Sequence, residues 1–287
     1  MQGSLPDISI RQLEYLVAVA DFPTWSEAAV DVGVSASALS QGLAELERRV
    51  GIPLFDRTGR RRLIRPGASE VLAHARQVVA LTADLARWVD RTRDGSIGKL
   101  RVGMIDAAAV GHFADVLREF KRQHRGIDMH LAVAPSSALI DDLTAGRVDM
   151  AVCVQPPAPV AGIETAPLLV EELAVYSGGE DVTRPAAKWG PWVMFPRGSH
   201  TRMLIVDALT ELGAPIEIVA ESHQPDVLRS MVGLGLGWTV LPVVQGEGHG
   251  DHLTRGRVIA TRQLVVATRT GAAVDPSIDL LEGALRR

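Results

Sequence analysis

Residues 24–41 read TWSEAAVDVGVSASALSQ, a stretch with two helix starts on either side of one glycine. Thr24 and Glu27 have the spacing of a capping box. In this motif the hydroxyl accepts a backbone N–H of the first helical turn, and the carboxylate accepts the backbone N–H of the capping residue. Gly33 suits a left-handed stop for that first helix, and Ser35 is a favourable N-cap for the next one. The stretch therefore predicts two helices joined by a tight turn.

Three small or apolar residues indicate which kind of turn this is. Ala29 lets the two helices approach closely, Gly33 makes the turn, and Leu39 packs the second helix on the first. The second helix then continues with an apolar stripe of Leu39, Leu43, Leu46 and Val50. This is the spacing of a helix-turn-helix, whose second helix lies in the DNA major groove. Gly42 within that helix costs about 1 kcal/mol relative to alanine, so either the helix is locally soft or a close backbone approach is needed there.

Charge is distributed unevenly around this motif. The net charge is −4, yet residues 48–65 hold seven arginines against a single acidic residue, Asp56. Such a patch is typical of a nucleic-acid footprint, although a solvated arginine surface is the commoner origin of a charge run. Residues 54–64, which surround Thr58-Gly59, suit a hairpin, and residues 9–20 have the apolar spacing of a helix that precedes the motif.

Residues 66–93 contain nothing that breaks a helix, which predicts a segment about 40 Å long. Its apolar residues recur at heptad-like intervals and are Val71, Val78, Leu81, Leu85 and Trp88. A seam of this kind favours pairing with the same helix of a second copy. Packing on the chain's own C-terminal domain is the alternative.

The rest of the chain, after a hinge-like linker at 94–98, alternates between strands and helices. Strands are expected at 100–105, 127–134, 148–154, 173–176, 216–220 and 236–241, and helices at 107–122, 137–145, 203–212 and 224–235. This alternation predicts parallel α/β sheets. Because aromatic residues make up only 4% of the chain, aliphatic and alanine-rich cores are expected.

Composition narrows the function classes. The 287 residues suffice for about two domains, and 47% hydrophobic with 22% charged residues indicates a folded protein. No apolar run reaches the ~18 residues of a membrane span, and the N-terminus lacks a signal segment, so a cytoplasmic protein without membrane contact is expected. Cys153 is expected to be a buried small hydrophobe, and His249 and His252 are too few ligands for a metal site. No metal or other cofactor is therefore expected.

Together these motifs resemble the LysR-type transcriptional regulators over essentially the whole length of the chain. The N-terminal residues that carry the resemblance are Arg11-Gln12-Leu13-x-Tyr15-Leu16, Ala28-Ala29, Val34-Ser35-x-x-Ala38-Leu39-Ser40-Gln41, Leu46-Glu47, Gly51-x-Pro53-Leu54-Phe55-x-Arg57 and Pro66-Gly67. Downstream they are Leu100-Arg101-Val102-Gly103, Ala145-Gly146-Arg147-Val148-Asp149, Pro196-Arg197-Gly198-Ser199, Gly233-Leu234-Gly235-Leu236-Gly237 and Leu241-Pro242.

The resemblance implies an α/β protein with three parts. These are a winged helix-turn-helix at 1–65, a dimerisation helix at 66–95 and a two-lobed, periplasmic-binding-protein-like effector domain at 96–287. Lobe I would comprise about 96–169 and 268–287, and lobe II about 170–267, with crossings near 169–172 and 264–268. The implied function is a homodimeric or homotetrameric regulator that binds a dyad-symmetric operator in double-stranded DNA and responds to a small-molecule effector.

The resemblance also assigns candidate DNA contacts. The base-facing start of the recognition helix would be Ser35, Ala36, Ser37, Ser40 and Gln41, and the wing would bring Arg57, Arg60, Arg61 and Arg62 to phosphate or the minor groove. Family members usually have Gln then Pro where this chain has Ala36-Ser37. Because alanine cannot make the bidentate adenine contact of glutamine, readout is expected to depend on Gln41 and Ser40.

The effector cleft is expected at strand ends and helix starts of the α/β lobes. The candidate residues are Asp106, Ala107, Ser136, Ser137, Gly198, Ser199, His200, Thr201 and His223. Ser199 and Thr201 are candidates to hold a carboxylate, although Ser199 also suits a helix cap and the histidines also suit solvated loops. Asp106 is most simply an N-cap. The family commonly has a hydroxyl residue where Ala107 stands, and its absence beside Asp106 argues against a simple carboxylate effector.

Three other functions would require different features. An enzyme on the same lobes needs a nucleophile with a base or a pair of carboxylates, and no such set of catalytic residues is visible. A transport binding protein needs an export signal. A helix-turn-helix that contacts only proteins would show no salt-dependent binding to duplex DNA. The sequence does not indicate the effector, the operator, or whether the regulator activates or represses.

Overall fold

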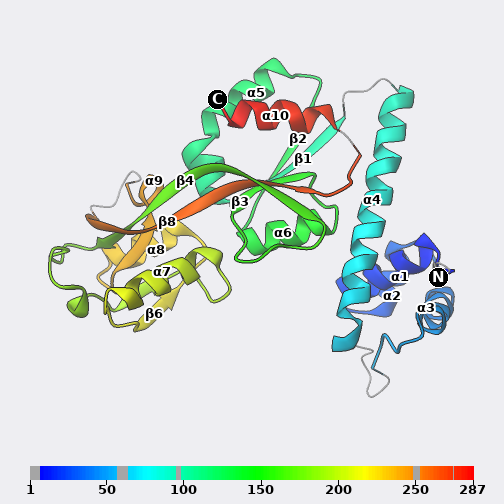
Figure 1. Ribbon diagram of the computed structural model, residues 1–287, viewed down its shortest axis with the longest axis horizontal. Helices are drawn as coiled ribbons and strands as arrows, with labels where there is room; N and C mark the ends of the chain where they lie inside the picture. Colours follow the sequence, from blue (N-terminus) through cyan, green and yellow to red (C-terminus); the bar gives the residue numbers. More distant parts are fainter. Residues whose placement is uncertain (1–6, 57–63, 95–97, 248–252, 274) are drawn as a thin grey trace, which may run out of the picture. The chain divides into compact units, whose positions relative to one another are not determined.

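Figure 1 shows the computed structural model of the chain, which describes residues 7–56, 64–94, 98–247, 253–273 and 275–287. The chain forms two compact units, the first comprising residues 1–90 and the second most of residues 91–287. The first unit has one hydrophobic core, and the second unit has two.

The first unit is helical. Its elements are α1 (Ile10–Asp21), α2 (Trp25–Asp31), α3 (Ala36–Val50), the short 3-10 helix η1 (Pro66–Ala68) and α4 (Ser69–Asp94). The three short helices pack Leu16, Ala29 and Leu39 into their shared core. Between α3 and η1, Phe55 and Ile64 form an antiparallel bridge at the base of the predicted wing. The helix-turn-helix is thus present with the core that its apolar spacing predicts.

Side-chain caps begin α2 and α3 as predicted. The Thr24 hydroxyl accepts the backbone N–H of Glu27 at 3.2 Å, and the Ser35 hydroxyl accepts an N–H of the first turn of α3 at 3.1 Å. Gly33 between the helices has a φ of +69°. The contacts described for Thr24 include only this half of the predicted capping box, without the return bond from the Glu27 carboxylate. One hydroxyl cap at each helix start, with a glycine between them, is enough to define the turn.

The second unit is built on a mixed sheet. Its strands are β1 (Lys99–Met104), β2 (Asp128–Val133), β3 (Met150–Val154), β4 (Ile163–Ser177), β5 (Trp192–Met194), β6 (Ile218–Glu221), β7 (Thr239–Pro242) and β8 (Thr254–Arg269). The main sheet has the order β2-β1-β3-β8-β4-β7, and β5 and β6 form a second, parallel pair. Strands β1 to β3 are parallel as predicted, but every pairing of β4 and β8 is antiparallel. The prediction of parallel sheets was wrong for the pairings of β4 and β8, because β4 runs out of one lobe and β8 runs back beside it.

These two long strands connect the lobes. They pair from Ile163 opposite Arg269 to Ser177 opposite Thr254, and they cross between the two cores where Glu171 lies opposite Arg262. Lobe I here denotes β1–β3 with their helices, and lobe II denotes β5–β7 with theirs. The returning strand crosses at residues 260–264, slightly earlier than the 264–268 that the resemblance implies.

The helices of this unit cover the sheets of both lobes. They are the π-helical segment η2 (Ala107–His112), α5 (Ala114–Gln123), α6 (Ser136–Thr144), the 3-10 helix η3 (Ala186–Lys188), α7 (His200–Glu211), α8 (Pro225–Gly233), α9 (Val243–Gly246) and α10 (Pro276–Leu285). Figure 1 shows α5 and α10, which contact each other, on one face of lobe I and α6 on the other. The helix predicted at 107–122 is in fact two segments. A Cβ on Gly111 would lie 2.9 Å from the Val244 side chain, so η2 approaches α9 more closely than a larger residue allows.

The two cores of this unit differ in composition. Lobe I has the expected aliphatic and alanine-rich core. Lobe II instead centres on Trp189, Trp192 and Trp238, whose ring centroids lie 6.1 to 6.5 Å apart. The expectation of aliphatic cores was wrong for lobe II, because three of the five tryptophans of the chain gather in one cluster.

Candidate functional site

The start of α3 presents short polar side chains to solvent. Ala36, Ser37 and Gln41 are exposed, and Ser40 is half-buried, while Leu39 on the opposite face is buried. With its inner face fixed in the core, α3 holds this exposed N-terminal surface in one orientation. The capping Ser35 belongs to the same surface, so all five residues predicted from the recognition helix lie together.

Gly42 is explained by its neighbour on α1. A Cβ at this position would lie 2.7 Å from two ring carbons of Tyr15, Cδ2 and Cε2. Of the two alternatives raised by the sequence, the structure therefore supports close approach of the α3 backbone to α1. Trp25 is partly buried beside the same core and packs edge-on against Phe55, with 5.1 Å between ring centroids.

The arginine run is partly neutralised. Glu45 accepts hydrogen bonds from Arg48 and Arg49, and these bonds lower the pKa of Glu45 to about 2. Arg65 pairs with Asp56 at 3.2 Å. The local excess of positive charge is therefore smaller at the ends of the run than the sequence count indicates. The four arginines predicted at the tip of the wing, Arg57, Arg60, Arg61 and Arg62, lie outside the described residues.

The predicted seam of α4 contains exposed apolar side chains. Val71, Val78 and Leu81 are half-buried, whereas Leu85 and Trp88 are 56% and 44% exposed. Large apolar side chains that are exposed to solvent along one helix are typical of a surface that another helix covers.

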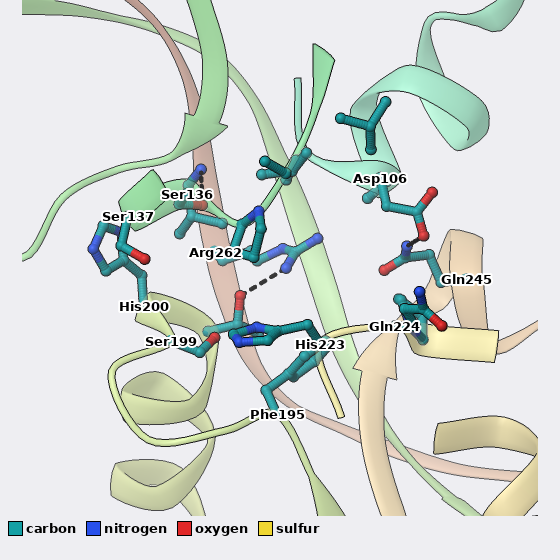
Figure 2. Close-up of a pocket in the computed structure, with 18 of the residues that line it drawn as sticks. Asp106, Ser136, Ser137, Phe195, Ser199, His200, His223, Gln224, Gln245 and Arg262 are labelled. Atoms are coloured by element: carbon teal, nitrogen blue, oxygen red, sulfur yellow. Dashed lines mark hydrogen bonds between the residues drawn. The ribbon is translucent and has the colours of Figure 1, made fainter. Parts of the chain in front are cut away.

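A cavity of about 550 Å³ lies within the second unit, lined from both lobes (Figure 2). The residues around it are Ile105, Asp106, Ala107, Val133, Ala134, Pro135, Ser136, Ser137, Val154, Phe195, Ser199, His200, Thr201, His223, Gln224, Pro225, Asp226, Gln245 and Arg262. Eight of the nine predicted effector residues are among them. Gly198 is the exception, since it lies in the turn before α7 with a φ of +87° and does not line the cavity.

Hydroxyl groups on both lobes already have backbone or side-chain partners. Ser199 caps α7, accepting the Arg202 N–H at 3.4 Å, and also lines the cavity, so capping and exposure to a ligand coexist. Ser136 accepts the Val154 N–H at 3.1 Å. Thr201 accepts a hydrogen bond from Arg262 at 2.7 Å, which positions its hydroxyl against that guanidinium.

Asp106 differs from its predicted role. Its backbone is already helical, with φ −53° and ψ −48°, and its side chain makes no capping hydrogen bond. The prediction of an N-cap was wrong, because an N-cap residue needs an extended backbone for its side chain to fold back. Asp106 instead lines the cavity, and its carboxylate points toward Gln245, from which it accepts a long hydrogen bond at 3.4 Å (Figure 2).

The segments of the chain that contain these two sites each match a domain described for known proteins. Residues 10–68 match the family described as "Bacterial regulatory helix-turn-helix protein, lysR family", and residues 93–287 match "LysR substrate binding domain". The chain belongs to the LysR family of transcriptional regulators. It is therefore a DNA-binding regulator with an effector-binding domain rather than an enzyme.

Individual relatives agree with this assignment. The chain is 30% identical to the probable hydrogen peroxide-inducible genes activator of Streptomyces viridosporus, over 97% of this chain and 93% of that protein. It is 32% identical to the transcriptional regulator EstR of Acinetobacter baylyi, over 97% and 96% of the two chains. Its fold is similar to that of a full-length OxyR variant from Pseudomonas aeruginosa, with a TM-score of 0.70 and 22% identity over 97% and 95% of the chains.

The LysR effector domain contains a buried polar network that the sequence did not predict. One carboxylate oxygen of Glu171 on β4 accepts a hydrogen bond from Nε of Arg262 on β8 at 2.5 Å. Its other carboxylate oxygen lies 2.6 Å from Nε2 of His112 at the end of η2. Arg262 also donates a hydrogen bond to Thr201 on α7. The network therefore passes through both crossing strands and reaches His112 in lobe I and Thr201 in lobe II. Burial lowers the pKa of Arg262, while the charge of Glu171 opposes that shift. The pairing register of β4 with β8 places Glu171 opposite Arg262, and the packing of η2 and α7 adds His112 and Thr201.

The remaining candidates from the sequence are Cys153, His249 and His252. Cys153 is fully buried in β3, and burial raises the pKa of its thiol to about 12. Among the described residues, no group of three or more His, Cys, Asp or Glu side chains is placed to hold a metal ion. His249 and His252 lie outside the described residues. Within the described parts of the chain, no helix combines the length and apolar character that a membrane crossing needs.

Proposed function

We propose that this LysR-family regulator binds its effector in the 550 Å³ cavity and that closure of the lobes around it changes operator binding. The observation that carries the proposal is the cavity itself, whose lining comes from both lobes and whose volume lies in the range of small-molecule sites. A ligand that contacts both lobes has different affinities for open and closed arrangements. Such a difference is what allows it to shift the DNA-binding equilibrium.

The DNA-binding assembly in this proposal is a dimer or tetramer, acting in the cytoplasm without a cofactor. The α4 seam pairs with that of a second copy, which brings two α3 helices to the half-sites of a dyad-symmetric operator. Ser35, Ala36, Ser37, Ser40 and Gln41 face the bases, and the wing arginines neutralise phosphates. The exposed Leu85 and Trp88 support the pairing surface.

Thiol oxidation is a poor fit as the signal for this chain, although one relative is named for hydrogen peroxide. The chain has one cysteine, and redox-sensing cysteines are exposed, have a low pKa and often have a resolving partner. Cys153 is buried, and its pKa is raised. These observations favour a bound small molecule as the effector.

A cavity-filling variant tests the effector site. Ser137 lines the cavity yet is exposed, so Ser137→Trp fills the site without disturbing a core. A metabolite screen by thermal shift on the full chain identifies compounds that stabilise the protein, since a ligand at 100 times its Kd adds about 2.7 kcal/mol. Each compound found is then tested for its effect on operator affinity.

The expected result is that Ser137→Trp loses both responses while its ligand-free DNA affinity stays normal. Ser230→Trp is the matched control, because Ser230 is an exposed serine on α8 that does not line the cavity. A compound that still acts on Ser137→Trp would place the effector site elsewhere in the chain.

A further inference from the structure

The charges around the effector cavity are unbalanced. Apart from two histidines, the lining side chains that carry charge are Asp106, Asp226 and Arg262. Arg262 is matched by Glu171, and the two side chains are only 4% and 2% exposed. The one guanidinium at the cavity wall is thus neutralised from behind, which leaves two carboxylates to set the charge of the site.

Asp106 is the less solvated of these carboxylates. It has no ion-pair partner among the described residues, and its only hydrogen bond, from Gln245, is long at 3.4 Å. Asp226 stands at the start of α8, where its side chain is 89% exposed and lies 3.4 Å from Arg229. Burial raises the pKa of Asp106, and the negative charge of Asp226 raises it further. Both effects show that the folded protein disfavours the charged form of Asp106.

A positively charged ligand is the simplest source of the ion-pair partner that Asp106 lacks among the described residues. A half-buried carboxylate beside a like charge is costly unless a cation pairs with it. A carboxylate effector would add a third negative charge near Asp106, whereas an amine or a guanidinium would pair with it directly. Asp106 therefore favours a ligand that carries a positive charge.

Resting on the proposed effector site, we propose that the effector is an organic cation whose amine or guanidinium group binds Asp106. Gln245 lies beside that group and Asp226 adds longer-range attraction. In Figure 2, Asp106, Gln224 and Gln245 lie on one side of the cavity, and Ser137, Ser199 and His200 lie on the opposite side. The ligand therefore carries a second polar group at a distance from its positive end, and the serine hydroxyls receive that group.

Matched pairs of probes test the sign of the charge. Binding of putrescine and tyramine to the full chain is compared by calorimetry with that of adipate and 3-(4-hydroxyphenyl)propionate, which replace each amine by a carboxylate. Agmatine is included as a guanidinium probe. At least one of the three cations is expected to bind about tenfold or more tightly than the better carboxylate, which is the effect of one charge-assisted pair.

Variants of the two carboxylates show which one is responsible. Asp106→Asn keeps the shape of the side chain and is expected to weaken cation binding by about ten- to a hundredfold. Asp226→Asn is the matched control, expected to weaken it by less than about threefold because its charge is solvated. Asp106→Glu retains the charge and is expected to retain part of the binding. Operator binding without ligand, measured for each variant, shows that the protein is folded.

The outcomes separate this inference from the proposed site. If carboxylates bind more tightly than the three cations, and Ser137→Trp abolishes that binding, the cationic effector is overturned while the effector site stands. If none of the three cations binds, or if Asp106→Asn binds them normally, the inference is also overturned. If cations bind equally well to Ser137→Trp, both the inference and the proposed site are wrong.

Discussion

The two units of this regulator hold their functional residues in different ways. In the first unit, the caps that begin α2 and α3 each join residues three apart in sequence, and the recognition surface comes from a single helix. In the second unit, Ser199 and Ser136 make shorter-range contacts, but the side-chain contacts of Asp106 and Arg262 join residues 61 to 139 apart, from both lobes and both crossing strands. The DNA-reading surface is therefore fixed locally, whereas the effector site exists only when distant segments are assembled. This difference suits a regulator, because the part that must respond to a ligand is the part whose geometry depends on the arrangement of two lobes.

The largest expected effect comes from breaking the long-range network at Arg262. Arg262→Met leaves Glu171 as a buried charge without its main partner, which typically costs about 3–5 kcal/mol. Thermal unfolding should show a loss of roughly 10 °C for a unit of this size. Arg286→Met is the matched control, because the pair of Arg286 with Glu282 is more exposed and should contribute at most about 1 kcal/mol. A loss for Arg262→Met no larger than that of the control would mean that the network does not hold the lobes.

The sequence predicts the first unit better than the second, because the helix caps of the first unit are short-range and the contacts of Asp106 and Arg262 in the second are long-range. The cap residues and the apolar stripe of α3 are short-range features, so they could be read from residues 24–50 without knowing any partner. The cavity was predicted only as a set of strand ends and helix starts, and eight of its nine candidate residues do line it. Arg262, Glu171 and Gln245 were missed because their roles depend on register and packing between distant segments. The cap assigned to Asp106 failed for a local reason, since the backbone of the π-helical η2 is already helical at that residue.

The next prediction concerns assembly through α4. Leu85→Glu places a charge in the proposed seam, where burial without a partner is costly. The variant is expected to elute as a smaller species and to lose about a hundredfold or more in operator affinity, because two linked half-site contacts become one. Leu85 is 56% exposed in the single chain, so the fold of the protomer should be retained.

Ala86→Glu is the control for this test, because Ala86 is an exposed neighbour on the same helix that lies outside the seam. It is expected to keep both the assembly and the affinity. A Leu85→Glu variant that remains oligomeric would show that α4 does not provide the contact between copies.

A smaller effect is expected for base readout by α3. Gln41 is the longest hydrogen-bonding side chain among the five predicted base-facing residues, and it is exposed. Gln41→Ala should lose about 1–3 kcal/mol of discrimination at one base pair in each half-site. Selection of binding sites from random duplexes measures this directly. Ala44→Ser, a change at another exposed position of α3, serves as the control, and an unaltered selected motif for Gln41→Ala would remove Gln41 from readout.

The smallest expected effect tests whether even the local unit depends on one close contact. In an open helix, Gly42→Ala would stabilise α3 by about 1 kcal/mol through backbone entropy. Here the added Cβ would lie 2.7 Å from the Tyr15 ring, and overpacking of that kind costs about 1–3 kcal/mol. The net expectation is a loss of about 1 kcal/mol in the free energy of unfolding, measured in urea on the full chain. In a Tyr15→Ala background the clash is gone, so the same substitution should become stabilising, and a double-mutant cycle should give a coupling of about 1–3 kcal/mol. If Gly42→Ala stabilises both backgrounds equally, the ring of Tyr15 yields without cost, and the position of α3 is set by its buried leucines alone.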